Sequence, residues 1–166
     1  LWGVRDLAHR RALAMLDAHT YSQENPRQIG AFPVPINPFQ WSGVVGTDSA
    51  YHVLPVNALG GDVDVKHTRI FRKAEPAPAL DTAMKTRTAA IFLDFARFPW
   101  GSVDEREDGY DVTLRDLRFL SSAIARRGFV VEVSLDKNLK VGSESFSFSA
   151  PPGRGGGQAP EEGAVP

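Results

Sequence analysis

Cysteine is absent from this chain of 166 residues. Its absence excludes a disulfide framework, a thiolate nucleophile and any metal site with cysteine ligands. No apolar run approaches the roughly 18 residues that a membrane-spanning helix needs. With a formal net charge of −1, nucleic acid is not an expected partner, and the basic positions from Lys66 to Lys73 are interpreted as a solvated face.

Complete catalytic motifs are also missing. His9, His19 and His52 are scattered and lack the spacing of paired metal ligands on a helix. No Gly-x-Ser-x-Gly elbow is present, so the serines show no sign of a nucleophile in a strand-to-helix turn. We therefore predict no catalytic residue and no cofactor in this chain.

Asp62, Asp64 and His67 are the strongest candidates for metal ligands. They fall in a segment, 62–72, that is predicted to be a strand. Side chains alternate between the two faces of a strand, so both carboxylates would project away from the imidazole. The prediction is that no metal is bound here unless a bulge breaks the alternation.

The composition is that of a globular protein, with 42% hydrophobic and 23% charged residues. We expect one domain over residues 1–149 and a disordered tail over 150–166, which is rich in Gly and Pro. The chain begins at Leu1 without a methionine and inside a helical pattern. This start predicts a fragment of a longer protein.

Hydrophobic spacing predicts an α+β fold. Helices are expected at 1–21 and 79–98, with a proline-rich extended stretch at 26–40, and strands at 41–47, 50–58, 62–72, 110–119, 128–135 and 139–148. We expect one curved, mostly antiparallel sheet packed against the long second helix, as in a cystatin or NTF2-like roll. The first helix would be an addition to this roll.

One polar cluster invites a functional interpretation. The candidate ligand-binding residues are Trp41, Arg87, Arg97, Trp100, Asp116 and Arg118. In the expected strand at 110–119, Asp116 and Arg118 project to the same face as the core-facing residues. Arg87 falls beside the apolar stripe of the second helix. Buried charges are costly unless they are paired. The cluster is therefore either a structural ion-pair network or an anion-binding pocket rimmed by the two tryptophans.

A wider pattern of aromatic and proline segments carries a family resemblance. It comprises Arg10-Arg11, Pro33, Pro35, Asn37-Pro38-Phe39 before Trp41, Arg87, Phe95-Ala96-Arg97-Phe98-Pro99 and Asp116-Leu117-Arg118-Phe119. Over residues 5–140 the chain resembles the C-terminal soluble part of YdjM-like membrane-bound, metal-dependent hydrolases of the bacterial inner membrane. The resemblance implies several membrane helices upstream, and metal-binding residues that lie in that membrane part.

Three functions follow as expectations. The first is a non-catalytic accessory domain that positions or recognises a substrate or partner, with its own N-terminal membrane region as a partner. The second is a module that binds a small anion or a lipid head group. The third, a self-contained enzyme, would require His67, Asp116 and one further group to meet in one cleft. The oligomeric state is not predicted.

Overall fold

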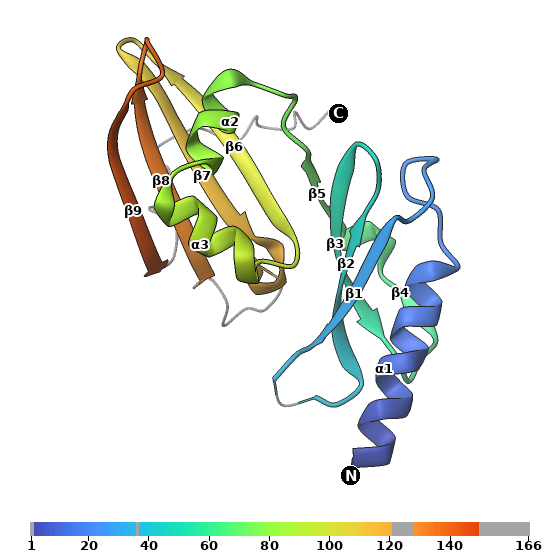
Figure 1. Cartoon of the computed structure of the whole chain (residues 1–166). Helices are drawn as coiled ribbons and strands as arrows, with labels where there is room; N and C mark the ends of the chain where they lie inside the picture. The colour runs from blue at the N-terminus through green and yellow to red at the C-terminus, as the bar shows by residue number, and fades with distance from the viewer. Residues whose placement is uncertain (1, 36, 121–127, 150–166) are drawn as a thin grey trace, which may run out of the picture.

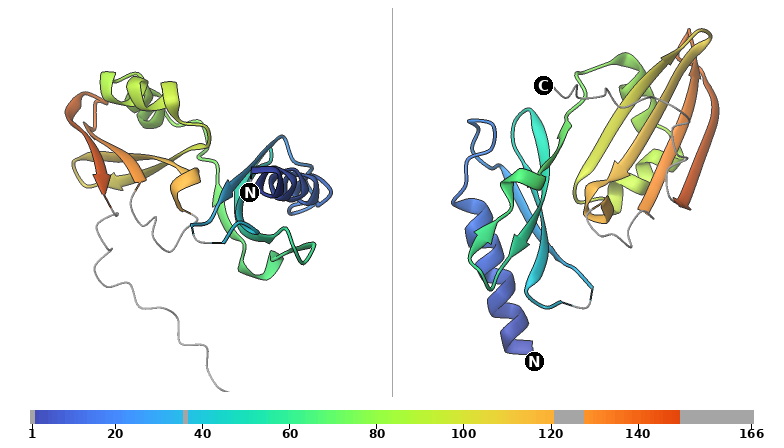
Figure 2. Two further views of the ribbon diagram at one scale, coloured as in Figure 1. Left: turned by 90° about the horizontal axis from the view of Figure 1, so that it is seen from below. Right: turned by 180° about the vertical axis from the view of Figure 1, so that it is seen from behind.

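The computed structural model describes residues 2–35, 37–120 and 128–149, which form three α-helices and two antiparallel sheets (Figure 1). This confirms the α+β class. Each sheet has its own helical layer, and the two sheets lie next to each other (Figure 2). Among the described residues, no helix has both the length and the apolarity needed to cross a bilayer.

The N-terminal sheet packs against helix α1. Its elements are α1 (Trp2–Asp17), β1 (Gln28–Pro33), β2 (Gln40–Gly46), β3 (Ala50–Asn57), β4 (Asp62–Val63), the 3-10 helix η1 (Val65–His67) and β5 (Arg69–Arg72). The strand order is β1-β2-β3-β4, and β5 pairs with β3. β1, which falls within the proline-rich stretch, lies at the sheet edge, where proline is tolerated. Trp41 and Val45 project toward Leu16 of the helix. Gly43 permits this close packing, because a Cβ there would lie 2.6 Å from a Leu16 methyl carbon.

The C-terminal sheet is a four-stranded meander. Its elements are α2 (Pro78–Met84), α3 (Arg87–Phe95), β6 (Pro99–Arg106), β7 (Gly109–Asp116), the 3-10 helix η2 (Leu117–Leu120), β8 (Gly128–Asp136) and β9 (Val141–Ser149). The strand order follows the chain, β6-β7-β8-β9. Alternate residues such as Val112 and Val131 project from the sheet onto Ala83 and Phe92 of the two helices.

A third core cluster joins the two halves. Val44 and Tyr51 come from the N-terminal sheet, and Phe98 and Leu117 come from segments flanking β6 and β7. Hydrogen bonds cross the same junction, among them one from the Arg69 guanidinium to the carbonyl of Leu120. The Gln28 side-chain amide donates to the carbonyl of Arg97 at 2.9 Å, and the indole N–H of Trp100 donates to the carbonyl of Arg72 at 2.7 Å. The junction is therefore both apolar and hydrogen-bonded.

Several sequence-based expectations need correction. The helix expected at 79–98 is divided because Thr86 has extended backbone angles and caps α3, its side chain accepting from the Ala89 N–H at 3.3 Å. The strand expected at 62–72 is interrupted by η1, and β6 forms at Pro99–Arg106, where no strand was expected. The strands form two sheets, so the cystatin or NTF2-like roll around one long helix is not confirmed. The single domain over 1–149 stays a prediction, and the tail from 150 lies outside the described residues.

His52 is a buried titratable group beneath α1. Its side chain is 2% exposed and packs against the Tyr21 ring, with the ring centroids 5.2 Å apart. Within the described part of the chain its Nε2 atom has no hydrogen-bond partner. Burial lowers the pKa of His52, because the imidazolium would lose its hydration there.

This burial predicts a loss of stability in mild acid. The ordinary pKa of histidine is about 6.5, so in the unfolded state His52 binds a proton as the pH falls below that value, whereas in the folded state its lowered pKa keeps it neutral. The free energy of unfolding should therefore fall as the pH drops from 7.5 to 5.5. Urea unfolding at both pH values should show a smaller fall for H52L than for the native chain. The exposed His19 provides the control. If H19L and H52L reduced the fall in the free energy of unfolding by the same amount, burial of His52 would not be its cause.

Candidate functional site

Asp116, which is buried, and Arg118, which is partly buried, form an ion pair at the end of β7. Asp116 is 2% exposed, and the Arg118 Nε donates to its Oδ2 at 2.7 Å. The backbone N–H groups of Arg97 and Arg118 each donate to the same carboxylate at 3.1 Å. The Arg118 guanidinium also donates to the carbonyl of Phe95 at 3.2 Å. The carboxylate thus ties the segment after α3 to the end of β7, which favours the structural interpretation of this pair.

The remaining predicted residues do not complete a pocket around this pair. Arg97 contributes its backbone, while its side chain is exposed. Arg87 is exposed at the start of α3, where its charge acts on Glu144 of β9. Trp41 lies beneath α1, stacked on His9 with the ring centroids 5.0 Å apart. The structure therefore brings Arg97, Asp116 and Arg118 together and places Trp41 and Arg87 elsewhere.

Trp100, the sixth predicted residue, lines a cavity of about 180 Å³ at the junction of the two halves. The cavity is lined by Tyr51, Lys73, Ala74, Leu80, Met84, Leu93, Pro99, Trp100, Gly101 and Leu114. Most of this lining is apolar and comes from α2, α3, β6 and β7. Tyr51 and Lys73 come from the N-terminal half, so neither half forms the cavity alone.

Lys73 is the charged residue of this lining. Its ammonium group donates to the carbonyl of Thr47 at 2.6 Å and lies 4.8 Å from the centroid of the Tyr51 ring. Burial raises the pKa of the Tyr51 hydroxyl, and the negative charge of Asp116 adds to this effect. A cation held over an aromatic ring beside an apolar cavity can pair with an anionic group of a bound molecule.

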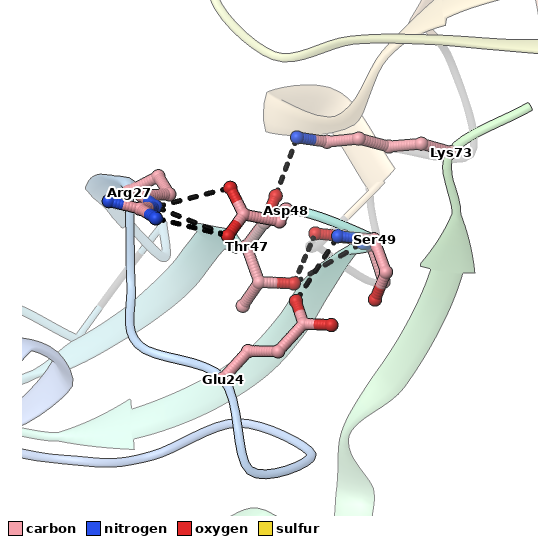
Figure 3. Close-up of polar contacts among 7 residues, drawn as sticks. Glu24, Arg27, Thr47, Asp48, Ser49 and Lys73 are labelled. Carbon is pink, nitrogen blue, oxygen red and sulfur yellow. Dashed lines mark hydrogen bonds and ion pairs between the residues drawn. The ribbon is translucent and has the colours of Figure 1, made fainter. Parts of the chain in front are cut away.

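A polar network holds the turn that receives this lysine (Figure 3). The Ser49 N–H donates to Glu24 at 3.1 Å, and hydrogen bonds from Thr47 and Ser49 lower the pKa of Glu24 to about 2. The Arg27 Nε donates to Asp48 at 3.1 Å on the outer side of the turn. The turn is thus held from both sides, and with it the Thr47 carbonyl.

Sequence reasoning missed Lys73 and Tyr51 as parts of a site. Lys73 follows β5 and was interpreted as one of several solvated basic residues. Its place is set by the pairing of β5 with β3, which lets the Lys73 N–H donate to the carbonyl of Ser49 at 2.9 Å. Strand pairing of this kind leaves no signal in the local sequence.

Asp64 and His67 meet, contrary to the prediction from strand alternation. The segment Val65–His67 is a 3-10 turn, and Asp64 caps it by accepting from the His67 N–H at 3.3 Å. The imidazole Nδ1 then lies 2.7 Å from the Asp64 carboxylate, and this contact lowers the pKa of Asp64. Within the ranges that the structure describes, no group of three or more His, Asp or Glu side chains could hold a metal ion.

A comparison with known families bears on the C-terminal half. Residues 78–150 match the family described as the YfhP C-terminal alpha/beta plait domain. The antiparallel meander of β6 to β9 with α2 and α3 on one face fits this description. No curated protein and no solved structure matches the chain significantly. The comparison does not confirm the resemblance to YdjM-like membrane hydrolases.

The Asp116–Arg118 pair predicts a large effect on stability. D116A would leave the Arg118 guanidinium and two backbone donors without their acceptor, so the free energy of unfolding should fall by about 3 kcal/mol. The exposed pair of Arg106 and Asp108 provides a matched control, and D108A should cost less than about 1 kcal/mol. Urea unfolding measures both, and equal effects would contradict a structural role for Asp116.

Proposed function

We propose that this chain is a non-catalytic recognition module of a larger bacterial inner-membrane protein of the YdjM-like hydrolase kind. Two observations support the proposal. The sequence pattern over residues 5–140 resembles the soluble part of that family. The family that matches residues 78–150 is described as a C-terminal domain, in keeping with a module that follows other segments. Its first partner would be the N-terminal membrane region of the parent protein.

The junction cavity carries the recognition role. At about 180 Å³ it is large enough for a compact apolar group, since an engineered cavity of about 150 Å³ in another protein binds benzene. Lys73 supplies one positive charge at the lining. The ligand class is therefore a short alkyl or phenyl group that bears a phosphate or carboxylate. We therefore propose a small-anion site at Lys73 and Trp100, in place of the Arg/Asp pocket expected at Asp116 and Arg118.

No chemical step is assigned to this chain. If the parent is a metal-dependent hydrolase, the resemblance implies that the metal lies in its membrane part, and this domain would select or orient the substrate. Divalent-metal-dependent hydrolysis by the isolated chain would contradict the accessory role.

Calorimetric titration of the chain with hexyl phosphate and hexanol tests the recognition site. Because the ammonium of Lys73 would pair only with the phosphate, K73M should weaken binding of hexyl phosphate about tenfold, equivalent to about 1.4 kcal/mol, and leave hexanol binding unchanged. A74F, which fills the lining, should weaken the binding of both.

Lys66 in η1 provides the matched control, because it carries the same charge and lies outside the cavity lining. K66M should bind both compounds as the native chain does. Failure of the native chain to bind either compound, or equal binding by K73M and K66M, would refute the site.

A further inference from the structure

We propose that His67 is a nucleophilic histidine that accepts a phosphoryl group at Nε2 from a small acyl phosphate such as acetyl phosphate. The product would be a phosphohistidine in η1 of the N-terminal half. His67 is not part of the lining of the junction cavity, so this modification site is independent of the proposed ligand site. The chain is the acceptor in this modification, and its non-catalytic role is unchanged.

His67 differs from the other three histidines of the chain in its surroundings. Each of the other three lies against an aromatic ring: His9 against Trp41, and His19 and His52 against Tyr21. The neighbour of the His67 ring is a carboxylate, that of Asp64, and the His67 side chain is 75% exposed. A small phosphoryl donor can therefore reach an imidazole that is already oriented by a negative charge.

Asp64 determines which ring nitrogen of His67 is reactive. Its carboxylate lies 2.7 Å from Nδ1, and it also accepts from the His67 backbone N–H at 3.3 Å. These hydrogen bonds lower the pKa of Asp64, so the carboxylate is ionised at neutral pH and can only accept a hydrogen bond. Nδ1 therefore carries the proton of the neutral imidazole, and Nε2 keeps its lone pair.

Two cavities beside the imidazole provide room for a phosphoryl group. His67 lines both of them, one of about 380 Å³ and one of about 600 Å³, and Arg69 lines the first. Both volumes fall within the range of roughly 300 to 1,000 Å³ that is usual for small-molecule sites. The Arg69 guanidinium donates to the carbonyl of Leu120, and its remaining N–H donors can attract phosphoryl oxygens. This positive charge favours a phosphoryl donor over a neutral electrophile.

The modification is a direct phosphoryl transfer from the acyl phosphate to His67. The lone pair of Nε2 forms a bond to phosphorus, and the bond between phosphorus and the acyl oxygen breaks, so that acetate leaves. The Nδ1 proton stays in its hydrogen bond with Asp64. The negative charge of this carboxylate offsets the positive charge that the ring acquires, and the transfer is faster than at a histidine without such a partner.

Incubation of the native chain with acetyl phosphate, followed by peptide mass spectrometry at neutral pH, tests the site. One phosphoryl group should appear on His67 before the other histidines react, and H67Q should acquire none at that stage. His19 is the internal control for exposure, because it is exposed but packs against an aromatic ring. In concentrated urea the preference should disappear, because it depends on the folded geometry. No phosphoryl group on His67, or equal modification of His19 and His67 in the folded chain, would overturn the proposal.

A pair of aspartate variants tests the part played by Asp64. D64N keeps an oxygen that can cap η1 but removes the charge beside Nδ1, so phosphorylation of His67 should slow about tenfold. D62N is the matched control, because Asp62 is exposed and lines the same 600 Å³ cavity, and it should not slow the reaction. Equal rates for D64N and D62N would contradict activation by Asp64. Phosphorus NMR of the product should show the bond at Nε2, and attachment at Nδ1 would contradict the same assignment.

Discussion

The hydrogen bonds to the Asp116 carboxylate are the constraint on which the junction of this protein depends. By accepting from the Arg97 N–H, the carboxylate fixes the chain at the point where α3 ends and β6 begins. The next residue, Phe98, is thereby placed in the core between the two sheets, 3% exposed. Two residues further, Trp100 lines the junction cavity. One buried charge therefore organises the contact between the halves.

The same junction explains why the candidate ligand site has an apolar wall and a cationic edge. The C-terminal half contributes Leu80, Leu93 and Leu114, which belong to or pack against its own core. The N-terminal half contributes Lys73, held at the carbonyl of Thr47 in a turn that Glu24 and Arg27 support. Apolar surface and charge come from different parts of the chain, and each is stabilised within its own half.

Local patterns predicted much of the secondary structure. The alternation of Phe129, Val131, Val133 and Leu135 identified β8, and helical spacing identified α1.

The divided helix was missed because an apolar stripe can run across a break, while the break itself depends on the backbone of Thr86. β6 was missed because its charged end resembles a loop until it pairs with β7, where Asp104 lies opposite Asp111. The meeting of Asp64 and His67 was missed because a 3-10 turn replaces the expected strand.

The sequence by itself determined the α+β class, the exclusion of the proline-rich stretch from the centre of a sheet, and the need of Asp116 and Arg118 for partners. These features depend on alternation, on proline geometry and on the cost of burying charge, which act over short distances along the chain. Only the tertiary structure decided that the strands form two sheets, that Trp41 and Arg87 lie apart from Asp116, and that Lys73 approaches Trp100 at one cavity. Those outcomes depend on which strands pair across long separations, and local sequence does not encode that choice.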